Sequence, residues 1–179
     1  TTDIEYYPFA SDTNAAAATP TMRAGGMFGQ GEAVGNGATV YKIGGRDNEG
    51  SNVMTNIIEK FPTTSIAGSI SDVGDLTSSK FKVAGSASET HGYAAGGSPP
   101  STPSLNNIEK VTFAVDGNAT DVGDLTVGRD NMAGISSPTH GYTAGGITTQ
   151  SPGNTFTDTI DKFTFASDGN ATDVGNLDF

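Results

Sequence analysis

The chain has no cysteine and no tryptophan among its 179 residues. Without cysteine it has no disulfide bond, no thiolate metal ligand and no cysteine nucleophile. Basic residues are scarce as well: nine Lys and Arg stand against twenty Asp and Glu, which gives a formal net charge of −11. This balance argues against binding to nucleic acid or to an anionic membrane surface, since both require a basic protein surface.

Long apolar runs and helix signals are also missing. No apolar stretch is long enough for a transmembrane helix. Apolar residues make up 34% of the chain and are joined by 25 glycines, a balance that is normal for a globular protein. The length of 179 residues fits one ordinary domain. The acidity favours a soluble protein in an extracellular or virion setting.

A near-verbatim block recurs along the sequence. Residues 108–126 read IEKVTFAVDGNATDVGDLT, and residues 160–177 read IDKFTFASDGNATDVGNL. The tripeptide DVG begins at Asp72, Asp121 and Asp173, so its copies are 49 and 52 residues apart. A di-glycine pair ends at Gly45, Gly97 and Gly146, so its copies are 52 and 49 residues apart. A period near 50 with several short β-like runs per unit is typical of a radial β-repeat.

Each unit is predicted to hold four strands. In the last unit NMAGISS (131–137) is the innermost strand, because its small residues suit a crowded axis. HGYTAGG (140–146) comes second, TIDKFTFA (159–166) third and TDVGNL (172–177) outermost. The intervening DGN (168–170) predicts a tight turn with positive φ angles. The sequence thus predicts an all-β protein.

This pattern resembles the kelch repeat. The di-glycine strands correspond to YKIGG (41–45), GYAAGG (92–97) and GYTAGG (141–146). The third strands correspond to IEYYPF (4–9), IEKFPT (58–63), IEKVTF (108–113) and IDKFTF (160–165). The basic residue before the innermost strand corresponds to Arg23, Lys80 and Arg129. The sequence motifs FAxDGNATDVGDLT and THGYTxGG are similar to those of the kelch-type repeat proteins of marine bacteriophages. Such proteins are often part of virion appendages, so the resemblance implies the same location for this chain.

The resemblance implies a β-propeller with kelch-like four-stranded blades, and residues 1–179 are then expected to form one propeller domain or part of one. Counted in strands, the chain begins with a half blade (3–20) and continues with blades at about 21–76, 79–125 and 128–177. Three complete blades and a half are fewer than a closed propeller normally uses. We therefore expect an incomplete ring: the chain is truncated, or a continuation or another copy completes it.

The candidate catalytic and metal residues all recur from unit to unit. DGNATD at 116–121 and 168–173 alternates oxygen ligands as calcium loops do, but it lacks the glycine and the glutamate of such loops. His91 and His140 occupy equivalent positions, which favours a structural role over catalysis. The basic residues at 23, 80 and 129 form either a cationic ring around a channel or ion pairs with Asp75, Asp124 and nearby carboxylates. We expect the ion pairs, no cofactor, no metal site and no catalytic residue.

The loops between second and third strands differ most between units, at 46–56, 98–107 and 147–159. A rigid scaffold that displays divergent polar loops is typical of a binding surface, although drift in unconstrained loops gives the same pattern. The candidate ligand-binding residues are Arg46, Asn48, Asn106, Asn107, Gln150, Asn154 and Phe156. The polar members suit hydrogen bonds to sugar hydroxyls, and the phenyl ring offers a stacking surface.

These observations predict a non-enzymatic structural and binding module, located on a phage tail or fibre and involved in attachment to the host surface. Its expected partners are other virion or surface structural proteins, further copies of itself, and a host cell-surface glycan. Two alternatives remain open: a carbohydrate-active propeller enzyme such as a lyase or glycosidase, and a kelch-type protein-interaction adaptor. A copper oxidase of the galactose oxidase kind is excluded, because its tyrosine–cysteine cross-link needs a cysteine.

Overall fold

The computed structural model describes residues 3–6, 16–21, 32–46, 53–63, 70–101, 103–149 and 153–178. Throughout these residues the regular elements are β-strands, β1 to β16, and none is a helix. A helix able to cross a membrane is accordingly not found in the described part of the chain. The all-β prediction is confirmed.

Three four-stranded antiparallel sheets form the body of the molecule. The first sheet contains, in spatial order, β3 (Glu32–Gly35), β4 (Thr39–Arg46), β5 (Met54–Pro62) and β6 (Ser71–Asp75). The second contains β7 (Ala84–Ala87), β8 (His91–Ala95), β9 (Asn107–Thr112) and β10 (Thr120–Asp124). The third contains β11 (Ala133–Ser136), β12 (His140–Ala144), β15 (Thr159–Thr164) and β16 (Thr172–Asn176). Because β11 and β16 lie at opposite edges of their sheet, the predicted strand order within a unit is confirmed.

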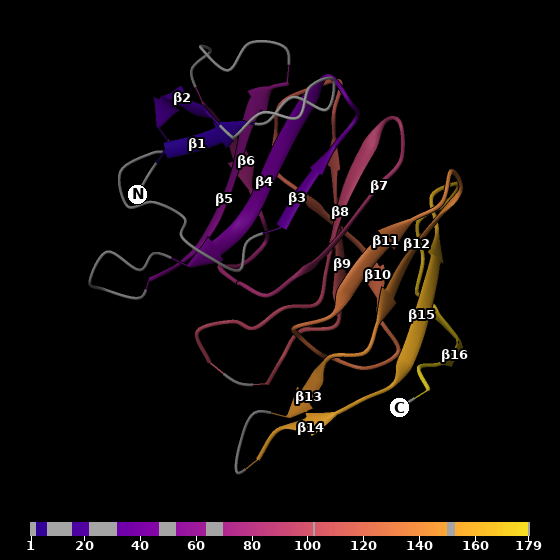
Figure 1. Ribbon diagram of the computed structural model, residues 1–179. Helices are drawn as coiled ribbons and strands as arrows, with labels where there is room; N and C mark the ends of the chain where they lie inside the picture. The colour runs from indigo at the N-terminus through magenta and orange to yellow at the C-terminus, as the bar shows by residue number, and fades with distance from the viewer. Residues whose placement is uncertain are drawn as a thin grey trace.

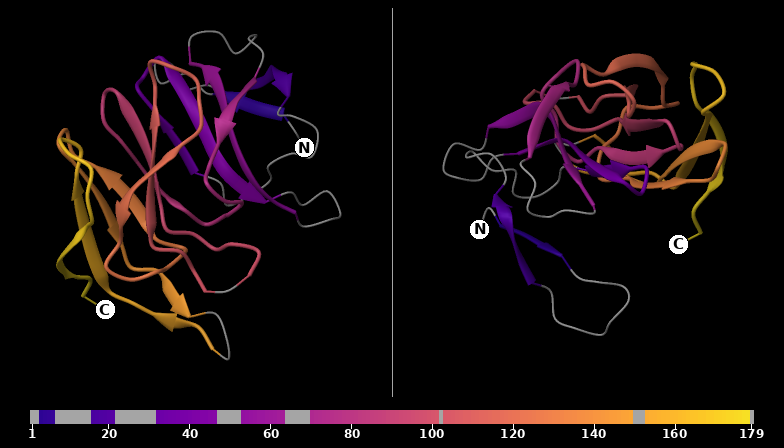
Figure 2. Two further views of the ribbon diagram at one scale, coloured as in Figure 1. Left: turned by 180° about the vertical axis from the view of Figure 1, so that it is seen from behind. Right: turned by 90° about the horizontal axis from the view of Figure 1, so that it is seen from above.

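The three sheets lie side by side in chain order (Figures 1 and 2). Their first strands meet, since β7 contacts both β3 and β11. A separate hairpin of β1 (Asp3–Tyr6) and β2 (Ala16–Thr21) projects from the row beside the first sheet, whereas β15 and β16 lie at the far end of the row (Figures 1 and 2). A second short hairpin, β13 (Ile147–Thr149) with β14 (Thr155–Phe156), extends from the third sheet.

A β-bulge recurs at the DVG tripeptide of every sheet. In the first sheet Ile58 pairs with Gly74 and Glu59 pairs with Asp72, so Val73 is the extra residue. The third and fourth strands of the other two sheets repeat this shift at the equivalent positions. A bulge bends its strand and increases the local twist, which turns the outer edge of each sheet in the same way.

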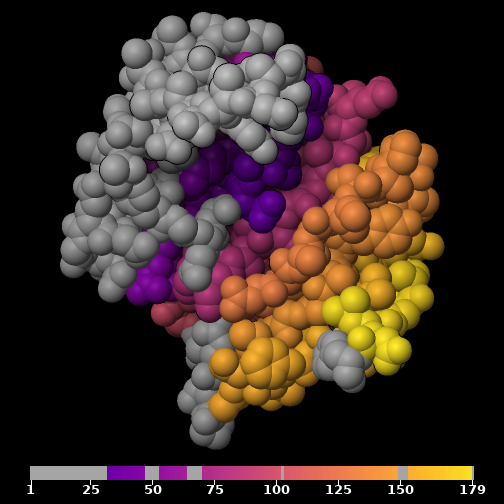
Figure 3. Space-filling model, in the orientation of Figure 1, coloured from indigo at the N-terminus to yellow at the C-terminus, as the bar shows by residue number. Residues whose placement is uncertain are grey.

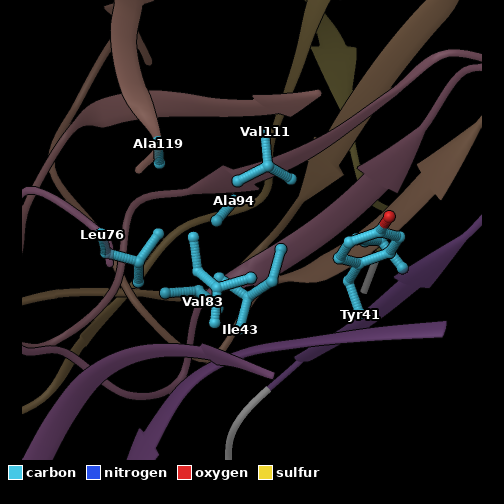
Figure 4. Close-up of a cluster of buried hydrophobic side chains, with 9 residues drawn as sticks. Tyr41, Ile43, Leu76, Val83, Ala94, Val111 and Ala119 are labelled. Carbon is cyan, nitrogen blue, oxygen red and sulfur yellow. The ribbon is translucent and has the colours of Figure 1, made fainter. Parts of the chain in front are cut away.

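The hydrophobic core lies between successive sheets and repeats from one interface to the next. We call the face that each sheet turns toward the following sheet its trailing face. Tyr41, Ile58 and Leu76 on the trailing face of the first sheet pack against Val111 and neighbouring side chains of the second. Figure 4 shows Ile43 and Leu76 of the first sheet gathered in one cluster with Val83, Ala94 and Val111. The trailing face of the second sheet uses the equivalent residues Tyr93, Ile108 and Leu125 against Phe163 and Ala171.

The loop between third and fourth strands fastens each sheet to the preceding one. The Asn118 carboxamide accepts a hydrogen bond from the Asp75 amide (3.0 Å), and the Ala119 amide donates to the Asp75 carbonyl (2.8 Å). The Asp116 carboxylate pairs with the Lys60 ammonium at 2.5 Å. Asp168, Asn170 and Ala171 make the same three contacts with the second sheet.

The predicted positive-φ turn at the DGN tripeptides is therefore wrong. Asp168 and Asn170 are not among the residues with positive φ angles, and the φ angle of Gly169, at 159°, is close to extended. The polar side chains of DGN serve contacts between sheets rather than a tight hairpin. The close fit also explains Gly74, because a Cβ atom there would lie 2.2 Å from the carbonyl oxygen of Gly117.

Candidate functional site

The variable loops and the crossovers between sheets lie at one edge of the row of sheets. The Gly45 amide, at the end of β4, donates to the carbonyl of Lys80 in the next crossover (2.9 Å). The Gly97 amide donates in the same way to the Arg129 carbonyl (3.0 Å). Gly45 and Gly97 have φ angles of 125° and 107°, which L side chains rarely adopt. The di-glycine pairs thus bring each variable loop next to the crossover that follows.

A buried ion pair anchors each described crossover. The Lys80 ammonium pairs with the Glu109 carboxylate, and the Arg129 guanidinium lies 2.9 Å from the Asp161 carboxylate. All four side chains are inaccessible to solvent. The expectation that these cations form ion pairs is confirmed for Lys80 and Arg129, whereas Arg23 lies outside the described residues.

The two carboxylates that the prediction named, Asp75 and Asp124, are not the partners of Lys80 and Arg129. Asp75 and Asp124 end the fourth strands and use their backbone groups to hold the next loop. The actual partners, Glu109 and Asp161, stand on the third strand of the same unit, and Glu59 occupies the equivalent repeat position in the first unit. The recurrence of an acidic residue at this position of the third strands was a signal visible in the sequence.

Burial shifts the pKa values of the cations along this edge. Desolvation lowers the pKa of Lys80 despite the opposing effect of Glu109, and it lowers the pKa of Arg129 despite Asp161. The pKa of Lys42 falls to about 8, chiefly through burial, with Glu59 acting in the opposite direction. These groups therefore carry a desolvation cost that their carboxylate neighbours only partly offset.

The two histidines lie in identical hairpin turns at the opposite edge. The imidazole Nδ1 of His91 hydrogen-bonds to Thr90 Oγ1 at 2.8 Å, and His140 makes the same contact with Thr139 at 2.9 Å. The backbone amide of each histidine donates to a serine hydroxyl three residues earlier. The partner of each ring is thus the adjacent threonine of its own turn, not a neighbouring loop. The geometry gives both rings a turn-stabilising role.

Three candidate ligand-binding residues lie beside the structural crossovers. The Arg46 guanidinium lies 5.5 Å from the centre of the Phe81 ring. The Asn107 carboxamide accepts a hydrogen bond from Lys80 Nζ (3.0 Å), and the exposed Asn106 accepts one from the Leu125 amide through its backbone carbonyl (2.7 Å). Arg46 and Asn107 therefore meet at the crossover around residues 80–81, where both take part in contacts within the protein.

Asn154 and Phe156 lie together on the hairpin that projects from the third sheet. Both are exposed, and the Phe156 side chain is 70% accessible. Phe156 also lines an open hollow of about 360 Å³ together with Gly145, Ile147 and Leu177. The sequence prediction placed these residues in an irregular loop and missed β13 and β14, although the β-branched run ITT at 147–149 was a strand signal. Asn48 and Gln150 lie outside the described residues.

A second hollow, of about 300 Å³, lies at the opposite edge between the histidine turns of the second and third sheets. It is lined by Ser88, Glu89, Thr90, Pro138, Thr139, Phe165 and Ala166. No group of three or more histidine or carboxylate side chains suited to a metal ion is found within the described residues. The exposed hairpin with Asn154 and Phe156 is thus the described part of the predicted binding surface that is most accessible to a ligand.

The chain matches no protein-family model, and no curated protein shows significant sequence similarity to it.

Proposed function

We propose that this chain is a non-enzymatic β-propeller module of a bacteriophage virion appendage, a tail or a fibre, which takes part in attachment to the host surface. The propeller arrangement is supported by the contacts among β3, β7 and β11, the first strands of successive sheets. In a propeller these strands converge on the central axis, with the outer strands β6, β10 and β16 at the periphery.

The observation that most supports a non-enzymatic function is that the recurring polar residues have structural roles. The repeated acids Glu109 and Asp161 hold buried cations, Asn118 and Asn170 hold the preceding sheet, and the histidines stabilise turns. The residues that recur from unit to unit thus hold the scaffold together. The loops that vary lie together at one edge, which is how a rigid scaffold presents a recognition surface.

The proposed ligand is a host cell-surface glycan, and the proposed contact is the β13–β14 hairpin. An exposed phenyl ring stacks on the apolar face of a sugar, and an exposed carboxamide can both donate to and accept from sugar hydroxyls. Phe156 and Asn154 supply these two groups next to a hollow. Other virion or surface proteins and further copies of the chain are its proposed structural partners.

Binding of the labelled chain to a panel of bacterial cells and of polysaccharides extracted from their surfaces tests this function. We expect saturable binding to a subset of the panel, and a loss of at least about tenfold in affinity for Phe156→Ala, in the range of a removed stacking contact. The matched control is Val115→Ala, because Val115 is also 70% accessible but lies in a third-to-fourth-strand loop. Absence of binding across the panel, or equal loss in both variants, would contradict the proposal.

The same polysaccharides distinguish the enzymatic alternative. A lyase or glycosidase would release unsaturated or reducing ends during incubation, whereas a binding module leaves the polymer intact. Chain-length analysis of the incubated polysaccharide measures this directly. Release of such ends by the purified chain would replace the binding function with the carbohydrate-active one, and selective capture of purified virion proteins without any glycan binding would favour the adaptor function.

A further inference from the structure

The trailing face of the third sheet is open, although its residues repeat those that are buried on the other two sheets. Leu177 is 39% accessible, whereas the equivalent Leu76 and Leu125 are each 3% accessible. Val174, Tyr142 and Ile160 on this face are likewise exposed or only half-buried. Figure 3 shows β15 and β16 (orange to yellow) at the outer side of the molecule. The third sheet thus presents an interface without its partner.

The hollow beside Phe156 is part of this open interface. A Cβ atom on Gly44 would lie 2.7 Å from the carbonyl oxygen of Lys80, and one on Gly96 would lie 2.5 Å from that of Arg129. The equivalent Gly145 meets only Leu177 and the Thr157 carbonyl, and it lines the hollow. In the first two sheets, therefore, the crossover of the next unit fills the position that the third sheet leaves empty.

The two internal interfaces define which partner this face accepts. Each receives an aromatic ring that stacks on its tyrosine at 4.8 Å, namely Phe113 on Tyr41 and Phe165 on Tyr93. Each also receives the aspartate, asparagine and alanine that follow in the same loop. On the third sheet the matching positions are Tyr142 and Lys162, and Lys162 forms no ion pair with a described residue. The complementary partner carries the pattern F-x-x-D-x-N-A.

This pattern occurs three times in the chain: FAVDGNA at 113–119, FASDGNA at 165–171 and FASDTNA at 9–15. The first two copies are already used between the sheets. The third connects β1 and β2, whose pairs Glu5↔Ala17 and Tyr6↔Ala16 have the same register as Asp161↔Asp173 and Lys162↔Thr172 of the third sheet. Thr13 stands where the other two copies have a glycine. A Cβ atom at the equivalent Gly117 would meet nothing within 4 Å, so the interface has room for a side chain at this position.

We propose that the trailing face of the third sheet binds the N-terminal hairpin, through residues 9–15, of a second copy of this chain. The β1–β2 hairpin projects beside the first sheet and the β15–β16 face belongs to the third (Figures 1 and 2), so the contact joins two copies head to tail. Such a heterologous contact uses different surfaces on the two partners and closes into a ring or extends into a filament. The inference is argued from the repeated contacts between sheets and not from glycan binding, and its test follows self-association, so its failure and that of the glycan proposal are distinguishable.

Sedimentation velocity of the full chain over the micromolar range tests this contact. We expect the wild-type chain to associate with increasing concentration. Leu177→Asp should weaken the association at least about tenfold, because it places a charge at a position that is buried in both internal interfaces. Val115→Asp is the control, since Val115 is exposed on the second sheet. Circular dichroism checks that both variants fold.

A charge exchange identifies the partner segment. Lys162→Glu and Asp12→Lys should each weaken self-association, and a mixture of the two variants should restore it, because each mismatched end then meets a complementary one. A wild-type chain that stays monomeric would overturn the proposal, and so would association that Leu177→Asp leaves unchanged. Variants that weaken association singly but do not rescue each other would place a different segment on this face and overturn the assignment to residues 9–15.

Discussion

The Arg129 guanidinium lies 2.9 Å from the Asp161 carboxylate, and both side chains are completely buried between the second and third sheets. The guanidinium also donates to Thr143 and to the Thr159 carbonyl, while the carboxylate accepts from both the amide and the hydroxyl of Thr126. One ion pair therefore connects the end of the second sheet, the crossover, and two strands of the third. Its loss should affect the whole interface.

Arg129→Met should lower the free energy of unfolding by about 3–5 kcal/mol, because it leaves the Asp161 carboxylate buried without its counter-ion. The double variant Arg129→Met/Asp161→Leu should recover part of this loss, although the Thr126 amide then lacks its acceptor. Urea denaturation measures both. Lys110→Met, in the exposed pair with Asp168, is the control and should cost less than about 1 kcal/mol. A double variant less stable than Arg129→Met would contradict this account.

Gly123→Ala should destabilise the chain by about 1–3 kcal/mol, because its Cβ atom would lie 2.2 Å from the Gly169 carbonyl oxygen of the third sheet. Gly117→Ala is the matched control: its Cβ atom meets nothing within 4 Å, and its effect should stay within about 0.5 kcal/mol. Thermal unfolding distinguishes the two. Equal effects would mean that backbone entropy, and not close approach of the sheets, explains the DVG glycine.

Lys42 should make the stability rise with pH in the alkaline range. Its pKa is about 8 in the folded protein and 10.5 in the unfolded chain, so between these values the unfolded state binds more protons and the free energy of unfolding increases. Below about pH 8 both states are protonated and this contribution is constant. Urea midpoints from pH 7 to 9.5 should rise in the wild type and rise less in Lys42→Met. Identical slopes for the two proteins would exclude Lys42 as the source.

Removal of calcium should leave the melting temperature unchanged. The Asp116 and Asn118 oxygens of the DGNATD segment already bind Lys60 and the Asp75 amide, so they are engaged within the protein. Calorimetry with a chelator, and again after calcium is restored in excess, checks this. A fall of several degrees on chelation, reversed by calcium, would show that the segment holds a metal after all.

The repeat made the strand order predictable, because glycine pairs, alternating apolar residues and DVG recur at fixed places. Contacts between segments far apart in the chain were harder to predict. The partner of Arg129 stands 32 residues further along the chain, on the strand after a loop of variable length, and local spacing pointed instead to the nearer Asp124. DGN suggested a turn because its composition is typical of one, whereas its side chains in fact reach the neighbouring sheet.

The candidate site was predictable only in part. That the variable loops lie together followed from the repeat, but the β13–β14 hairpin depends on pairing of Ile147 with Phe156, which no repeat position encodes. Asn107 illustrates the opposite case. Its variable-loop position suggested ligand binding, while its carboxamide accepts a hydrogen bond from Lys80 within the protein.

The contact between Lys60 and Asp116 is repeated by Lys110 and Asp168, and this repetition bears on how such a chain evolves. The second unit carries both Lys110 and Asp116, and the third carries Lys162 and Asp168, so a tandem duplication of the gene segment for such a unit inserts a sheet that fits both neighbours at once. Loss of a unit by recombination likewise rejoins matching halves. Length can therefore change in whole units without new compensating substitutions, while the loops at the variable edge diversify independently.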